Sequence, residues 1–226
     1  MARIVAHRGA SAAFPPGNTL EAFADAVVQG AEWVELDVHL SADGQVVVHH
    51  DPILGDGRVI GELSVSELPD FIPTLAAALV SCHPLSVNVE IKPDGPDELR
   101  PLLIERVVEL LLSSGPEREF LVTSFDHDIV DTVRSLAPSI ATGLLTFDGA
   151  ALVDDLERAA SGGHSAINPW FAIVDRDFVD RAHGRGVEVN VWTVDEPDHI
   201  REMADIGVDA IITNVPRVCR DVISAR

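Results

Sequence analysis

Short runs of Val, Ile and Leu alternate with longer segments of helical periodicity from one end of the chain to the other. Nine runs have the length and composition of strands: 4–8, 33–38, 46–50, 86–91, 120–125, 140–145, 165–169, 187–192 and 210–213. Eight segments place apolar residues at helical spacing: 19–29, 73–81, 97–113, 127–136, 150–161, 175–184, 197–206 and 216–224. No Ser/Gly linker interrupts this order, so the pattern predicts an α/β fold in a single domain covering residues 1–226.

The third strand-like run differs from the others because no helix precedes it. Only HLSADGQ separates 33–38 from 46–50, and this is too short for a crossover helix. Asp43-Gly44 is a strong turn signal, so we interpret 46–50 as the returning arm of a hairpin. The eight remaining strands, each followed by a helix, predict a (β/α)₈ TIM barrel with an extra hairpin strand after the second barrel strand. An open doubly wound sheet alternates in the same way and is the alternative.

The register of the hairpin decides which side chains share a face. A turn at 42–43 places His50 opposite Glu35. Opposed side chains lie on one face with Cβ atoms about 5 Å apart. We therefore expect Glu35, Asp37 and His50 to point the same way and His49 to point away. A bulge of one residue would exchange the two histidines.

Another polar face lies on the run 86–91. Strand alternation puts Glu90 and Lys92 on one face, and the opposite, aliphatic face belongs against the helices. Glu90 would then join Glu35 and Asp37 near the carboxyl ends of the strands, where barrel enzymes build their sites. Clustered carboxylates either raise a pKa or bind a cation, and oxygen ligands suit Mg²⁺ or Ca²⁺. We predict one divalent cation here; the alternative is pairing with neighbouring cations or solvent.

Two histidines and two cations complete the predicted site. His7-Arg8 ends the first strand-like run, and Gly9 permits a close backbone approach to a ligand. Imidazoles titrate near neutrality, so His7 and His50 could transfer protons as general base and general acid. Arg8 and Lys92 supply positive charge for an anionic oxygen, and a guanidinium suits bidentate phosphate contact. A lone histidine on a barrel strand is more often a core residue, but this combination indicates phosphodiester cleavage.

Other polar and aromatic residues have simpler interpretations. Asn18 is expected to be the N-cap of the first helix, with Glu21 completing a capping box. Asn168 and Asn214 are expected to act as turn or cap residues. Trp192 is expected either to pack in the core or to contact an apolar part of a substrate.

The composition limits the classes of binding partner and the cellular compartment that we expect for the protein. The 226 residues are 46% hydrophobic, and 16 Lys+Arg against 37 Asp+Glu give a net charge of −21. This charge repels nucleic acid and anionic lipid surfaces, so the expected partner is a small-molecule substrate. Cys82 and Cys219 belong to no metal or redox motif, which predicts free thiols in a reducing compartment. Without a signal-peptide pattern or a membrane span, the sequence predicts a cytoplasmic protein.

Together these segments resemble the glycerophosphodiester phosphodiesterase family, within the phospholipase-C-like phosphodiesterases on TIM barrels. HRGAS and PPGNTLEAF are similar to its HRG and PENT motifs, and WVELDVHLSADGQVVVHHDPIL is similar to its E-x-D, turn and His-Asp segment. VEIK, TSFD, VNVWTVDEP and GVDAIITNVP follow in the family order. The resemblance implies metal-dependent hydrolysis of a glycerophosphodiester to sn-glycerol 3-phosphate and an alcohol.

The resemblance also implies a role for each residue of the predicted site. It implies catalysis by His7 and His50, metal binding by Glu35, Asp37 and Glu90, and phosphate contact by Arg8 and Lys92. It selects His50 over His49 because the family histidine directly precedes the aspartate.

The sequence departs from the family pattern in two places. Gly17 stands where the PENT motif has a glutamate near the metal and the arginine, so we expect altered metal affinity or an altered Arg8 orientation. The segment 51–74 is shorter than the usual insertion, which predicts a shallower mouth. Two other functions stay open: a phospholipase-D-like or cyclising lyase on the same scaffold, and a protein that binds glycerophosphodiesters without turnover.

Overall fold

A computed structural model describes residues 1–95, 97–115 and 117–225. Within these residues, eight parallel strands form a closed barrel: β1 (Arg3–His7), β2 (Trp33–Leu40), β4 (Ser86–Ile91), β5 (Phe120–Ser124), β6 (Ala141–Thr146), β7 (Ala166–Pro169), β8 (Glu188–Val191) and β9 (Ala210–Thr213). Their order is β1-β9-β8-β7-β6-β5-β4-β2, and pairing of β1 with β2 closes the ring. The closure confirms the barrel and rules out the open sheet.

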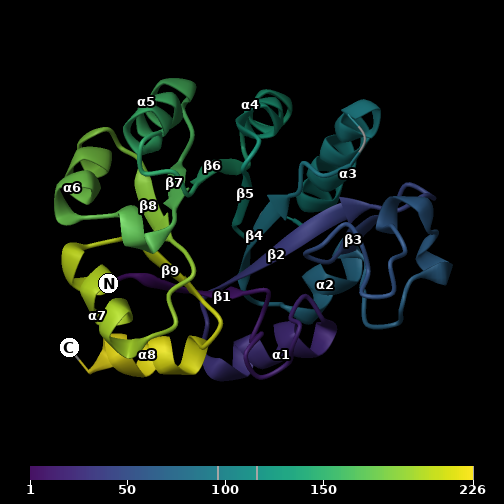
Figure 1. The fold of residues 1–226 in the computed structure, drawn as a ribbon, viewed down its shortest axis with the longest axis horizontal. Helices are drawn as coiled ribbons and strands as arrows, with labels where there is room; N and C mark the ends of the chain where they lie inside the picture. Colours follow the sequence, from purple (N-terminus) through teal and green to yellow (C-terminus); the bar gives the residue numbers. More distant parts are fainter. Residues whose placement is uncertain (96, 116, 226) are drawn as a thin grey trace.

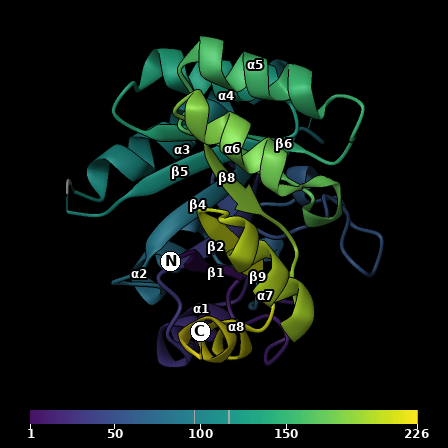
Figure 2. The ribbon, with the colours of Figure 1, turned by 90° about the vertical axis from the view of Figure 1, so that its left-hand side faces the viewer.

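The helices connect successive strands and surround the barrel (Figure 1). In the described part of the chain they are α1 (Leu20–Gln29), α2 (Leu75–Ser81), α3 (Arg100–Ser113), α4 (His127–Leu136), α5 (Leu152–Gly162), α6 (Arg176–Gly184), α7 (Pro197–Ile206) and α8 (Pro216–Ser224). The boundaries predicted from sequence lie within three residues of these ends. Figure 2 shows both chain ends on the same side, near α8.

The main hydrophobic core lies between the barrel and the helices. The aliphatic face of β4, formed by Val87, Val89 and Ile91, is fully buried in this core, as strand alternation predicted. The other face of β4 therefore points into the barrel and carries Asn88 and Glu90. No helix of the described residues is long and apolar enough to cross a membrane.

The extra strand β3 (Val46–Val48) pairs antiparallel with β2, as predicted, but the predicted register is wrong. Val48 lies opposite Val38, whereas a turn at 42–43 would place it opposite Asp37, so the observed pairing is shifted by one residue from the predicted one. The reason is the turn: Ser41 N–H donates to the Gln45 carbonyl at 2.9 Å, which leaves a three-residue loop with Gly44 at φ +73°. A left-handed glycine in the third loop position is typical of such hairpins, and the expected two-residue turn does not form.

The segment between β3 and α2 folds back over β3. Val48 N–H donates to the Pro73 carbonyl at 2.9 Å, and Val47 bridges to Thr74. A small second core joins Val47 to residues of this segment, including Leu54, Ile60 and Leu68. Two short 3-10 turns, η1 (Ile60–Glu62) and η2 (Val65–Glu67), lie within it.

Candidate active site

Three carboxylates meet at the carboxyl ends of β2 and β4. Glu35 and Asp37 come from β2 and Glu90 from β4, with Asp37 and Glu90 directly paired in the strand register. One ligand oxygen from each lies within 4.8 Å of the others. All three residues are buried. The alternation of β2 and β4 therefore brings the predicted acidic cluster together at the mouth of the barrel.

Two cations neutralise part of this cluster. The Lys92 ammonium lies 2.8 Å from Asp37 Oδ1 and 2.6 Å from Glu90 Oε1. The Arg8 guanidinium Nε lies 3.2 Å from Asp37 Oδ2, and the Arg8 backbone N–H donates to Glu35 Oε2 at 3.0 Å. Three carboxylates facing two cations leave one negative charge in excess. Glu35 Oε1 is buried and has no hydrogen-bond partner.

The pKa values show how strongly these charges interact. Burial raises the pKa of Glu35 well above its ordinary value, and the charges of Asp37 and Glu90 raise it further. Burial, followed by the charge of Asp37, raises the pKa of Glu90 to about 7. Burial also opposes ionisation of Asp37, but Lys92 and Arg8 outweigh it and lower the pKa of Asp37.

The donor set fits a hard divalent cation. All its atoms are carboxylate oxygens, which Mg²⁺ and Ca²⁺ prefer, and Glu35 Oε1 has no other partner. A cation would also remove the repulsion that raises the pKa values of Glu35 and Glu90.

His7 ends β1 beside this cluster. Its Nδ1 lies 2.7 Å from Asn214 Oδ1, and its Nε2 lies 3.9 Å from Glu35 Oε2. Asn214 Nδ2 donates to Asp195 Oδ2 at 2.7 Å, which fixes the amide so that its oxygen faces His7. Because that oxygen only accepts, Nδ1 carries the proton in neutral His7 and Nε2 has a free lone pair. Burial, assisted by the charge of Arg8, lowers the pKa of His7 to about 4.

Asn214 and Asp195 are residues that the sequence analysis missed. Asn214 was interpreted as a turn or cap residue, but it orients His7 across 207 positions of the chain. Asp195 accepts from the Asn214 backbone N–H at 2.8 Å and from Thr213 Oγ1 at 3.0 Å. The sequence signal that could have identified both residues is their position in VNVWTVDEP and GVDAIITNVP, two segments that carry the family resemblance.

The interpretation of Asn18 as a helix cap is also wrong. The N-cap of α1 is Thr19, whose Oγ1 accepts from Ala22 N–H at 3.2 Å. Asn18 has φ +57° and is buried, and its Nδ2 donates to Asp37 Oδ2 at 2.7 Å. The Asn18 amide therefore holds one of the carboxylates in place. A cap and a site residue give the same local pattern before a helix, so sequence alone did not separate them.

Gly17 is required by the backbone of the same loop. It has φ +80°, and a Cβ at this position would lie 2.8 Å from the Cβ atoms of both Arg8 and Ser11. Restoring a glutamate at this position would therefore bring its Cβ into collision with the Arg8 and Ser11 side chains. A side chain at residue 17 needs a different path of the loop.

His50 and His49 follow the end of β3. His50 N–H donates to His49 Nδ1, and His50 Nδ1 lies 2.8 Å from Asp51 Oδ1. The His50 ring is partly exposed, whereas His49 is half-buried with its ring edge against Phe71. In the observed register the backbone N–H of His49, not His50, donates to the Asp37 carbonyl. The predicted pairing of His50 with Glu35 is therefore wrong, and the choice of His50 over His49 rests on the resemblance to the family motif alone.

Trp192 follows β8 at the same end of the barrel. Its Nε1 donates to the Asn168 carbonyl at 2.7 Å, and its ring packs edge to face against Phe125, with centroids 5.6 Å apart. Phe125 in turn contacts Phe147 at 5.9 Å. These aromatic residues follow the ends of β8, β5 and β6, so they form a row along one side of the mouth. Phe125 and Phe147 were not singled out from sequence, because single phenylalanines after strands carry no pattern.

Comparisons with known proteins identify the family of the chain and agree with its barrel fold. The sequence profile of the glycerophosphoryl diester phosphodiesterase family matches residues 7–218. A glycerophosphodiester phosphodiesterase from Caldanaerobacter subterraneus subsp. tengcongensis is 30% identical over 234 residues, covering 94% of each chain. A phosphodiesterase from Oleispira antarctica, solved with the product sn-glycerol-3-phosphate, superimposes with TM-score 0.91 at 26% identity, covering 99% of this chain and 97% of that one. A glycerophosphodiester phosphodiesterase from Thermotoga maritima gives TM-score 0.81 at 26% identity, covering 98% of each chain.

Proposed function

Because this chain belongs to the glycerophosphoryl diester phosphodiesterase family, we propose that it hydrolyses glycerophosphodiesters to sn-glycerol 3-phosphate and an alcohol. The observation that carries the proposal is the buried cluster of Glu35, Asp37 and Glu90. In this cluster Glu35 Oε1 has no hydrogen-bond partner, and Glu35 Oε2 lies 3.9 Å from His7 Nε2. The Oleispira antarctica neighbour, which binds the same product, supports it.

Glu35, Asp37 and Glu90 would hold one divalent cation, Mg²⁺ or Ca²⁺. When bound, such a cation stabilises negative charge on phosphoryl oxygens and favours ionisation of a nearby water. The neighbouring Arg8 and Lys92 supply further positive charge at the place where the phosphate is expected. Both are already paired with Asp37, which holds their side chains at the mouth.

Proton transfer is assigned to His7 and His50. Water adds to phosphorus, the bond from phosphorus to the alcohol oxygen breaks, and that oxygen gains a proton. His7 suits the accepting role because Asn214 leaves its Nε2 lone pair free. His50 would donate to the leaving oxygen, with its ring oriented by the Asp51 carboxylate. Trp192 would contact the alcohol moiety.

Product analysis tests the reaction class. Glycerophosphocholine, glycerophosphoethanolamine and an aryl phosphodiester would be incubated with the protein, with and without EDTA, and followed by phosphorus NMR. We expect sn-glycerol 3-phosphate to form only when divalent cation is present. A cyclic phosphate as the end product would show a lyase, and binding of substrate without any product would show a non-catalytic protein.

A matched pair of variants tests the metal ligands. Glu90→Gln should bind divalent cation weakly and lose activity by orders of magnitude, whereas Asp43→Asn, in the hairpin turn, should behave as wild type. Full activity of EDTA-treated Glu90→Gln protein would contradict the proposal.

The proposal also covers the cellular compartment in which the protein acts. Cys82 and Cys219 are both buried and free, as expected for a protein of a reducing compartment. A cytoplasmic location is therefore part of the proposal, and fractionation of cells that express the protein would test it.

A further inference from the structure

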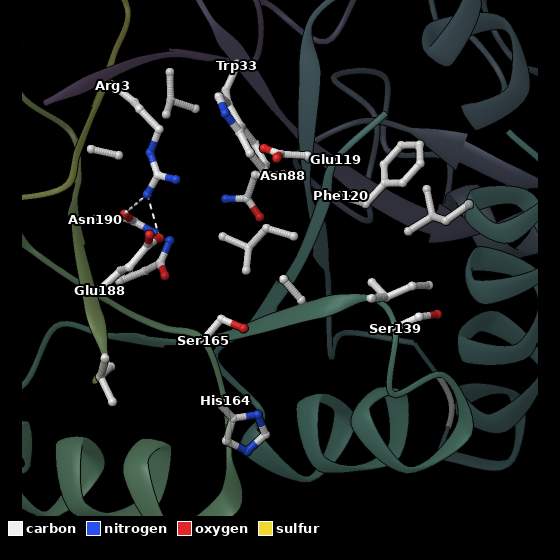
Figure 3. A pocket seen from close by; sticks show the side chains of 18 of the residues that line it. Arg3, Trp33, Asn88, Glu119, Phe120, Ser139, His164, Ser165, Glu188 and Asn190 are labelled. Carbon is white, nitrogen blue, oxygen red and sulfur yellow. Dashed lines mark hydrogen bonds and ion pairs between the residues drawn. The ribbon is translucent and has the colours of Figure 1, made fainter. Parts of the chain in front are cut away.

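A large cavity and a small hollow lie at opposite ends of the barrel. The cavity, about 1010 Å³, reaches the starts of the strands, and Figure 3 shows Arg3, Trp33 and Glu188 around it. None of the predicted site residues lines this cavity. The hollow, about 80 Å³, lies at the strand ends and is lined by Lys92 of the site and by His39. His39 is therefore a residue beside the site that the proposed reaction does not yet use.

His39 is a buried histidine on the hairpin part of β2. It lies opposite Val47 of β3, and only 5% of its surface is exposed. Its Nε2 lies 3.1 Å from the backbone carbonyl oxygen of His50. Because a carbonyl oxygen only accepts hydrogen bonds, Nε2 carries a proton and is the donor. A side chain of β2 thus holds the backbone of a histidine that is assigned to proton transfer.

The backbone around His50 has few other attachments to the barrel. β3 ends one residue before His49, whose N–H donates to a carbonyl of β2 at 3.1 Å. Further along, Ile60 N–H donates to the Pro52 carbonyl at 2.9 Å, so the chain there pairs within its own segment. Among the described residues, no backbone N–H donates to the His50 carbonyl. His39 is therefore the group that ties this carbonyl to β2.

The direction of the His50 ring depends on this attachment. The ring Nδ1 lies 2.8 Å from Asp51 Oδ1, but the Asp51 side chain is 66% exposed and belongs to the same loop. A contact between two neighbours in a loop orients the ring relative to the loop. The buried hydrogen bond from His39 fixes the loop relative to the barrel, and so relative to the carboxylates.

We propose that His39 is a positioning residue for proton transfer by His50. This inference rests on the proposed function, in which His50 gives a proton to the leaving alcohol oxygen. His39 transfers no proton itself and acts only by holding the loop. Its loss should therefore slow the breaking of the bond to the alcohol oxygen without weakening substrate binding.

Three variants separate the hydrogen bond from general stability. In His39→Gln the amide nitrogen stands as many bonds from Cα as histidine Nε2 and can replace the donor, whereas in His39→Asn it is one bond short. Val47→Ala removes buried apolar contacts on the opposite strand and leaves the hydrogen bond in place. Val47→Ala should lower the melting temperature, and it shows what a loss of stability alone does to activity.

Esters with different leaving groups distinguish positioning from a structural role. The substrates are the glycerol phosphate diesters of choline and of p-nitrophenol, because nitrophenolate leaves without a proton donor. On the choline ester, His39→Asn should lower kcat roughly 10–100-fold with KM unchanged, and His39→Gln should stay close to the wild type. On the nitrophenyl ester, His39→Asn and His50→Ala should both keep most of their activity. Val47→Ala should leave the ratio of the two activities unchanged.

A double variant tests whether His39 acts through His50. On the choline ester, adding His39→Asn to His50→Ala should cause no further loss, because residues that act as one unit are not additive. A further loss of about tenfold would overturn the inference. Equal losses of His39→Asn on both esters, or equal losses of His39→Asn and His39→Gln, would also overturn it. Wild-type protein that turns over neither ester would overturn the proposed function as well.

NMR of the wild type labelled with ¹⁵N-histidine gives a test that needs no variant. His39 Nε2, assigned through its own backbone, should carry a proton that exchanges slowly with solvent, because the donor is buried and hydrogen-bonded. A proton on Nδ1 alone would overturn the inference, whatever the activity of the protein.

Discussion

Glu90 is the residue at which burial and charge oppose each other most clearly. Its pKa of about 7 means that the folded state binds a proton more tightly than the unfolded chain, whose glutamate pKa is 4.5. The stabilising contribution of this group is therefore fully present below about pH 4.5 and is lost as the pH rises through about 7. Lys92 keeps Asp37 as a partner when Glu90 is neutralised.

The first prediction follows for protein freed of metal with EDTA. Glu90→Gln should raise the melting temperature by several degrees at pH 8, because glutamine resembles the protonated carboxyl. At pH 5 the variant and wild type should melt together. With divalent cation present the order at pH 8 should reverse, since binding to the native state stabilises only the wild type. Equal melting temperatures at both pH values in EDTA would contradict this account.

The second prediction concerns Asn18, which holds Asp37 through a 2.7 Å hydrogen bond. Asn18→Gly removes the amide but keeps a residue that adopts the observed φ of +57° without strain. Divalent-cation affinity should fall roughly 10–100-fold, as for other groups that orient metal ligands. Calorimetric titration measures this. Thr19→Ser, a control at the helix cap, should leave the affinity unchanged; an equal loss there would indicate a general effect on the loop.

At the scale of elements, the order and type of strands and helices were predictable because each depends on local periodicity. The predictions were wrong where a contact joins residues far apart in the sequence, or where a side chain changes the length of a turn. Ser41 Oγ accepts from Gln45 N–H at 3.0 Å and so supports the longer hairpin loop, which shifts the register. The pairing of His7 with Asn214 is likewise invisible to any local pattern.

The third prediction separates the two histidines after β3. His50→Ala should lower kcat by roughly 10²–10⁴-fold if this imidazole transfers a proton. His49→Ala should mainly lower stability, because it removes the ring that packs against Phe71 and accepts from His50 N–H. Steady-state kinetics and thermal melts of both variants distinguish these effects. Near-normal kcat in His50→Ala with a collapse in His49→Ala would exchange their roles.

At the scale of the whole molecule, the net charge of −21 opposes folding through self-repulsion. The fourth prediction is that raising NaCl from about 10 mM to about 150 mM increases the melting temperature, because the Debye length falls from about 30 to about 8 Å. Calorimetry in EDTA isolates this effect from metal binding. A melting temperature that falls with salt would show that attractive ion pairs outweigh the repulsion.

The covering of β3 by Pro73 and Thr74 has a consequence for concentrated solutions of the protein. A closed barrel offers no free strand edge, but an added outer strand creates one, with amide and carbonyl groups ready to pair with another molecule. Here Val48 N–H and the Val47 bridge are occupied from within the same chain. The hairpin that carries His50 to the mouth thus does not become a site where chains aggregate by strand addition.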